Sequence, residues 1–235
     1  MSPAVLIHSA KGSVNSSVKP LVASSDLSSS PTTDQSLHLA DSYRGYDHVT
    51  WYVGNAKQTA SYYVTRMGFK EVAYQGLETG SRYIASHVVS NKRVTFVLTS
   101  PIRGPAGPAE AIPEDEKQLL NDIHAHLSKH GDAVKDVAFR VDDVPAVYEA
   151  AMRRGAFCIK EPHSLQGYTH AVLGTYGDTT HTLVDHKQYA GVFRPGFREV
   201  MGGDPVAQYL PEIPLEFIDH CVGNQDWDQM QSACD

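Results

Sequence analysis

From residue 46 onward, short β-type runs of hydrophobic residues alternate with segments that have helical spacing. The run YDHVTWYVGN is rich in β-branched and aromatic residues and closes at Gly54-Asn55, which is typical of a strand. In AKQTASYYVTRM, the apolar residues fall on one helix face, so this run predicts a helix that Asn55 caps and Gly68 ends. Three strand-like runs follow: FKEVAYQ, SRYIASHVVS and RVTFVLTS.

A loop rich in Gly and Pro then leads into a single connecting helix, predicted over residues 113–131. The residues expected on its buried face are Leu119, Leu120, Ile123 and Leu127. After it the first order of elements returns: KDVAFRV is a strand, and Asp143 caps the helix VPAVYEAAMRR. Three strands follow again: FCIKEPHSL, THAVLGTYG and THTLVDH.

This repetition defines the fold class. The two helix-ending glycines, Gly68 and Gly155, lie 87 residues apart. A period of that size, with the same order of elements in each copy, indicates a βαβββ unit used twice, at residues 46–100 and 135–190. We therefore predict an α+β fold in which the two units form one open barrel, as the N-terminal domain at residues 43–200.

The chain outside this domain has two predicted parts. Residues 1–42 are rich in Ser and Thr and have little apolar periodicity, so we expect a disordered tail. Residues 201–235 contain the run PLEFIDHCVGNQDW, whose His220 follows Asp136 by 84 residues. We interpret this region as a linker and the first strand of a third unit that is begun and not finished, leaving that strand without a partner.

Composition and charge exclude some classes of binding partner. The formal net charge is −7 and no Lys/Arg cluster interrupts it, which argues against nucleic acid and anionic membranes as partners. No apolar run approaches the roughly 20 residues of a membrane span. The three cysteines are odd in number and far apart, so we expect reduced thiols and a cytoplasmic protein.

Five motifs together resemble one enzyme family: VTWYVGNAKQTASYYVTRMGF, YQGLETGSR, HGDAVKDVAFRV, TYGDTTHTLV and EFIDHCVGNQ. In this order they are similar to the 4-hydroxyphenylpyruvate dioxygenases, a family of the vicinal-oxygen-chelate superfamily, and to its eukaryotic members in particular. The resemblance covers residues 43–235.

The resemblance implies a glyoxalase- and dihydroxybiphenyl-dioxygenase-like fold, with four βαβββ units arranged as two barrels. It also implies Fe(II)-dependent conversion of 4-hydroxyphenylpyruvate and O₂ to homogentisate and CO₂ in tyrosine catabolism. In the family the second barrel binds iron through two histidines and a glutamate, and His220 matches the first of these ligands. The other two belong to the fourth unit, so we expect this chain alone to bind iron poorly, to have no catalytic residues of its own and to show no turnover. We also expect a homo-oligomer.

The same family correspondence singles out three residues of the first barrel. His48, Asp136 and Asp185 correspond to the ligand positions of the iron-binding barrel, and all three residue types can bind metal. One imidazole and two carboxylates suit Mn²⁺ or Mg²⁺ as readily as Fe(II). The alternative interpretation is a vestigial polar cluster.

The remaining histidines have structural interpretations. His126 and His130 lie in the last turns of the connecting helix, where cationic side chains favour the helix dipole. His181 and His186 are an odd number of residues apart on one strand and therefore face opposite sides.

Two other functions remain open. The first is a fragment of a hydroxymandelate synthase-like dioxygenase, which uses the same substrate and iron. The second is a binding or interaction domain without chemistry of its own, which uses the barrel cavity or the outer surface.

Overall fold

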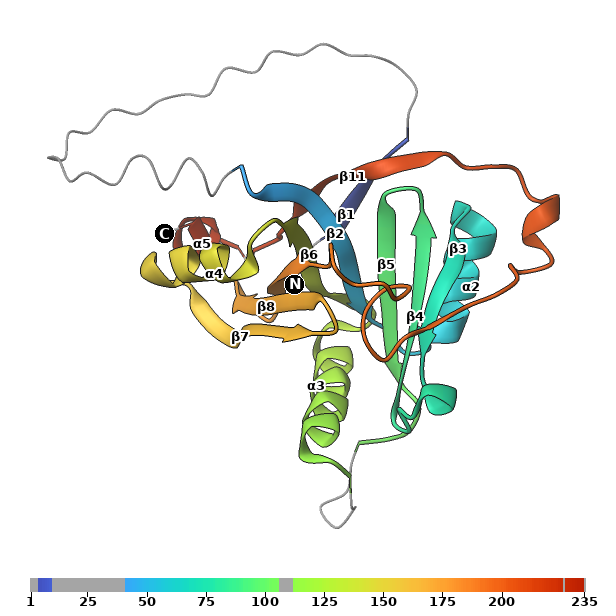
Figure 1. Ribbon diagram of the computed structural model, residues 1–235, viewed down its shortest axis with the longest axis horizontal. Helices are drawn as coiled ribbons and strands as arrows, with labels where there is room; N and C mark the ends of the chain where they lie inside the picture. Colours follow the sequence, from blue (N-terminus) through green and yellow to red (C-terminus); the bar gives the residue numbers. More distant parts are fainter. Residues whose placement is uncertain (1–3, 10–40, 106–111, 226, 235) are drawn as a thin grey trace, which may run out of the picture.

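A computed structural model describes residues 4–9, 41–105, 112–225 and 227–234. Nine of the strands form one strongly curved sheet, in the order β10-β3-β4-β5-β2-β6-β9-β8-β7 (Figure 1). The first half of this sheet contains β2 (Tyr43–Tyr52), β3 (Lys70–Gln75), β4 (Ile84–Asn91) and β5 (Val94–Pro101). The second half contains β6 (Ala133–Val141), β7 (Phe157–Leu165), β8 (Tyr168–Gly174) and β9 (Thr180–Asp185).

The two halves have the same topology, which confirms the predicted repeat of βαβββ units. The first strand of each unit pairs in parallel with the last strand of that unit, β2 with β5 and β6 with β9. The two first strands pair with each other in antiparallel fashion and join the halves. The result is the α+β open barrel that the repeat predicted.

Each unit places one helix on the outer face of its part of the sheet. Helix α2 (Ala56–Met67) begins where Asn55 Oδ1 accepts a hydrogen bond from the backbone N–H of Gln58, at 3.0 Å. Helix α4 (Val144–Arg153) begins in the same way, with Asp143 Oδ1 and the N–H of Ala146 at 3.0 Å. Both caps were predicted from the sequence. They satisfy backbone donors that a helix start otherwise leaves unpaired.

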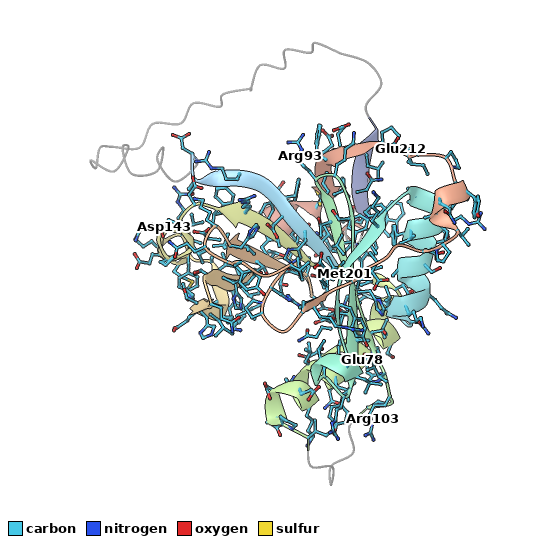
Figure 2. All side chains as sticks on the ribbon, turned by 45° about the vertical axis from the view of Figure 1, so that its right-hand side comes forward. Glu78, Arg93, Arg103, Asp143, Met201 and Glu212 are labelled. Carbon is cyan, nitrogen blue, oxygen red and sulfur yellow. The ribbon has the colours of Figure 1, made fainter. Side chains whose placement is uncertain are left out.

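The connecting helix α3 (Glu114–His130) lies at one end of the barrel (Figure 1). Figure 2 shows Glu78 and Arg103 at this end and Arg93 and Glu212 at the other. Leu120 and Ile123 are fully buried, as expected, but Leu119 is exposed and borders the barrel cavity. The buried face of the helix includes His126 instead, whose ring packs edge-on against Tyr52, with 5.2 Å between ring centroids.

A loop after β9 enters the concave side of the sheet. Phe193 and Phe197 pack against a buried cluster that includes Ala73, Val88 and Val97 of the first unit. Directly after Phe197, β10 (Arg198–Glu199) pairs with β3 at the sheet edge. The loop therefore covers part of the barrel interior and fixes residues 193–199 against the first unit.

The predicted first strand of the third unit is present as β11 (Leu215–Val222), and it has a partner strand. It pairs in antiparallel fashion with β1 (Ala4–Ser9), and Figure 1 shows the two strands together at one end of the barrel. The expectation of a disordered tail over residues 1–42 is therefore wrong at Ala4–Ser9, because the edge of β11 offers backbone groups that this segment can satisfy. Residues 10–40 of that tail lie outside the described residues.

Beyond these strands the chain has two 3₁₀ turns and one short helix. The turn η1 (Leu77–Thr79) lies within the stretch GLETGSR, between β3 and β4. The turn η2 (Ala207–Tyr209) precedes β11, and α5 (Met230–Cys234) follows it. No helix in the described part of the chain is long and apolar enough to cross a membrane.

Candidate functional site: the barrel cavity

The concave side of the sheet encloses a cavity of about 1390 Å³. Both βαβββ units contribute to its wall, α3 borders one end, and Arg194 and Pro195 of the inserted loop border it as well. Side chains on a strand alternate between faces, so every second residue of β2, β6 and β9 points inward. His48, Asp136 and Thr180 belong to this inward set.

Asp136 is the central buried acid of the cavity. The pairing register places it between Thr50 of β2 and Thr180 of β9. Its Oδ1 accepts hydrogen bonds from the hydroxyls of Thr180 at 2.6 Å and Thr182 at 2.9 Å. Burial raises the pKa of Asp136, and these two hydroxyls and His48 oppose the shift only in part.

His48 is held by a carboxylate next to it in the sequence. Its Nδ1 lies 2.7 Å from Asp47 Oδ1, while Asp47 Oδ2 lies 2.8 Å from Nε2 of His186. Burial alone would raise the pKa of Asp47, but the hydrogen bonds from His186 and His48 outweigh it, and this pKa lies below its ordinary value. The hydrogen bond to Asp47 in turn raises the pKa of His186 against the opposing effect of its burial. Asp47 therefore binds two imidazoles at once and orients the ring of His48 at the cavity wall.

Asp185 does not join the other two predicted residues. It lies an odd number of residues from the inward-facing Thr180 and Thr182, so it points to the opposite face of β9. Its Oδ1 accepts a hydrogen bond from the backbone N–H of Lys187 at 3.0 Å. The inferred correspondence therefore fails at Asp185, and it is the next residue, His186, that contacts the cluster through its hydrogen bond with Asp47.

A metal site in the first barrel is therefore not supported. Among the described residues, no group of three or more His, Cys, Asp or Glu side chains is arranged to hold a metal ion. The vestigial polar cluster, reduced to His48 and Asp136 with their hydrogen-bonding partners, fits the geometry.

His220 lies outside the cavity, on β11. Its side chain is 49% exposed, and its Nδ1 lies 2.7 Å from Oδ2 of the neighbouring Asp219. A facial iron site needs a third ligand and a protected position for the metal. The described residues supply neither around His220, so the chain as described does not fit Fe(II) by itself.

Of the two histidines of α3, His126 differs from the prediction and His130 agrees with it. Burial, followed by the nearby positive charges of His130 and Lys135, lowers the pKa of His126 to about 4, so it is neutral at pH 7 and carries no charge to favour the helix dipole. His130 Nε2 lies 2.8 Å from Asp178 Oδ2 and does sit at the end of the helix. His181 and His186 do face opposite sides, as predicted: His181 packs edge-on against Phe139, and His186 binds Asp47.

Two residues that matter for the cavity were not found from the sequence. Asp47 was overlooked beside His48, although an acid next to an inward-facing histidine is a recognisable signal. Arg194 reaches the cavity on a loop, and its guanidinium lies 4.8 Å from the ring centroid of Phe197. No local pattern indicates that placement, because it depends on how the loop packs against the first unit.

The architecture places the chain among proteins built from paired βαβββ units. The family model of the Glyoxalase/Bleomycin resistance protein/Dioxygenase superfamily matches residues 45–177, and the chain belongs to this superfamily.

Within that class, the most similar relatives share one description. The chain is 54% identical over 220 residues to 4-hydroxyphenylpyruvate dioxygenase of Aspergillus fumigatus, covering 91% of this chain and 54% of that protein. It is 56% identical over 197 residues to the protein of the same description from Coccidioides posadasii, covering 82% of this chain and 49% of the relative. The chain spans about half the length of the curated relatives that it matches.

One solved structure supports the fold. A triple mutant of 4-hydroxymandelate synthase from Streptomyces coelicolor aligns with a TM-score of 0.53 at 21% identity. The alignment covers 73% of this chain and 45% of that chain. At this identity the likeness bears on the fold and not on the reaction.

Proposed function

We propose that this chain is the first, structural barrel of a protein of the 4-hydroxyphenylpyruvate dioxygenase type, together with the start of the iron-binding barrel. The identity of 54% over 91% of the chain supports the family assignment. The observation that carries the structural role is the position of His220, which is half exposed on β11 and contacts Asp219, while no group of three metal-binding side chains exists among the described residues.

The proposed reaction of the whole protein is the Fe(II)-dependent conversion of 4-hydroxyphenylpyruvate and O₂ to homogentisate and CO₂. Fe(II) would bind the 2-oxo acid and O₂ once three protein ligands hold it on one face. His220 would be one of the three. The described residues do not complete that set, so no step of the reaction is assigned to them.

The role proposed for this chain is therefore structural: it packs the strand that carries His220 against a finished domain. Leu215 and Ile218 of β11 are buried in the same cluster as Val49, Phe69 and Phe96 of the first unit. That packing holds the part of β11 that leads to His220, whose side chain is half exposed. We also propose a cytoplasmic location, supported by Cys158 and Cys221, which are both unpaired thiols.

Sequencing the transcript through and beyond the codon for Asp235 tests the proposal. An open frame that continues into a further strand-borne histidine and a strand-borne glutamate would support an iron dioxygenase. An in-frame stop directly after Asp235 would contradict it and favour the second candidate, a binding domain without iron chemistry. The specific observation behind that second candidate is the cavity of about 1390 Å³ inside the first barrel.

A further inference from the structure

One corner of the barrel cavity gathers basic side chains from separate elements. Lys160 and His163 come from β7, His170 from β8 and Arg194 from the loop after β9, and all four line the cavity. The pairing of β7 with β8 shifts register on both sides of Lys160, which sets Lys160 opposite Val172 and His163 opposite His170. Register shifts of this kind redirect side chains, and here they turn two basic groups toward the cavity.

These basic groups have no acidic partner in the described part of the chain. Within the described part of the chain, the side chains of Lys160, His163 and Arg194 make no hydrogen bond or ion pair, and the buried Nδ1 of His170 has no hydrogen-bond partner either. Burial, followed by the positive charges of Lys160, Arg194 and His163, lowers the pKa of His170 to about 4. The corner is therefore an excess of positive charge that an anion would relieve.

The acidic side chains that line the cavity either lie on α3 or already have partners of their own. Asp115, Glu116 and Asp122 lie on α3, and Asp178 is already paired with Lys129 and His130. Asp136 is engaged by two threonine hydroxyls, and burial raises its pKa. None of these acids is among the groups that shift the pKa of His170.

Arg194 is positioned to present its donors. Its guanidinium lies 5.6 Å from the ring centroid of Phe193 and 4.8 Å from that of Phe197. Stacking on aromatic rings restricts a guanidinium and leaves its edge free for a bidentate carboxylate. Since the two rings are themselves packed against the first unit, the position of the donors is set by the fold.

The same corner has an apolar wall that is open to solvent. Phe157, Ile159 and Leu165 of β7 line the cavity, and the side chain of Phe157 is 72% exposed. Exposed apolar side chains beside unpaired cations match a ligand with an apolar body and a single anionic group.

We propose that the corner formed by Lys160, His163, His170 and Arg194 binds the carboxylate of a small organic acid, whose apolar body lies against Phe157, Ile159 and Leu165. The site is separate from His220 and needs no metal. It gives the first barrel a ligand-binding role of its own.

Isothermal titration of the full chain with phenylacetate tests this proposal, with the neutral phenylacetamide as matched ligand. We expect phenylacetate to bind with a Kd of about 1 mM or tighter. The amide should bind about tenfold more weakly or worse, because it has lost a charge-assisted pair. Equal binding of acid and amide, or no binding of either, would show that the basic corner does not select a carboxylate and would overturn the proposal.

Two variants and a control locate the site. Arg194→Gln and Lys160→Gln should each weaken phenylacetate binding about tenfold. Lys57→Gln on the outer helix α2 makes the same change of charge at an exposed position away from the cavity and should leave the Kd unchanged. Lys160 is exposed, so its variant stays informative if Arg194→Gln fails to fold, which circular dichroism reports. Binding of inorganic phosphate but not of phenylacetate, or an equal loss in all three variants, would contradict a site for an organic acid.

Discussion

Asp47 shows how one carboxylate can set the ionisation of its surroundings. It is largely buried and binds the imidazoles of both His48 and His186. Its own pKa lies below the ordinary value, so the stability it contributes is present above about pH 4 and is lost as the pH falls through the folded value. The pKa of His186 is raised, so its contribution is complete below about pH 6.5 and is lost as the pH rises through its folded value.

Asp47 is charged above about pH 4 and His186 is charged below about pH 6.5, so together they should stabilise the fold most between these two values. Asp47→Asn should lower the free energy of unfolding by about 1–3 kcal/mol at pH 5.5, because it removes a charged hydrogen-bond acceptor shared by two imidazoles. Above pH 7 the difference from the wild type should shrink as His186 loses its proton. Urea unfolding at pH 5.5 and pH 8 measures both values.

His220→Gln is the control for this pH series. The ring is half exposed, and within the described part of the chain its ion-pair partner is its neighbour Asp219, so its loss should cost less than about 0.5 kcal/mol at either pH. A destabilisation by Asp47→Asn that is equal at pH 5.5 and pH 8 would mean that His186 does not titrate with it.

Single residues were predictable where a local rule determines them. Asn55 and Asp143 cap their helices because a short polar side chain before an apolar helical face reaches the free backbone N–H groups. The assignment of Asp185 failed because one residue of error on a strand reverses the face. Arg194 could not be predicted, because the contact that positions it joins a loop to the first unit.

At the scale of an element, β11 divides into two faces with different roles. Leu215 and Ile218 are each 4% exposed in the main cluster of buried residues, whereas Phe217 is 38% exposed and lies beneath Arg93, 5.2 Å from its guanidinium. Leu215→Ala should cost about 2–5 kcal/mol of unfolding free energy through the cavity that it leaves. Phe217→Ala should cost about 1 kcal/mol or less. Equal effects in urea unfolding would show that β11 is not docked on the first unit.

Limited proteolysis tests the same docking without a substitution. A strand without a partner, as predicted from the sequence, would be cut readily after Pro214. Because β11 pairs with β1 and buries two side chains, we now expect cleavage to spare residues 215–222 and to begin after Val222. Rapid cleavage inside β11 would show that its pairing does not persist in solution.

Most helices and strands were predictable because the spacing of apolar residues and the repeat of the whole unit agree. The spacing of apolar residues gives each helix and strand, and the return of the same order after 87 residues gives the barrel. The pairing of β1 with β11 was not predictable. Residues 1–42, which contain β1, have little apolar periodicity, and the two strands lie over 200 residues apart in the sequence. The rotation of α3 was wrong at Leu119 because packing on Tyr52 favours His126 instead.

For the whole molecule, exposed apolar side chains predict association. Tyr209 is 82% and Trp227 93% exposed, although tryptophan is mostly buried in monomeric proteins. The charge of −7 opposes contact between copies but is screened over about 8 Å at physiological salt. We expect a dimer or larger species in sedimentation velocity at tens of micromolar, shifted toward monomer by Phe217→Lys. Leu215 on the same strand is buried and therefore unsuitable for this substitution. A single monomeric species would contradict this expectation.

The central claim is that residues 1–235 form a structural barrel and carry one iron ligand of a larger active site. The direct measurement is homogentisate formation by the purified chain, supplied with Fe(II), ascorbate, O₂ and 4-hydroxyphenylpyruvate. We expect none above the level without protein, because one half-exposed histidine cannot hold iron in a facial site. Homogentisate formation that is abolished by His220→Ala would contradict it, since the described residues would then have assembled an active centre around that histidine.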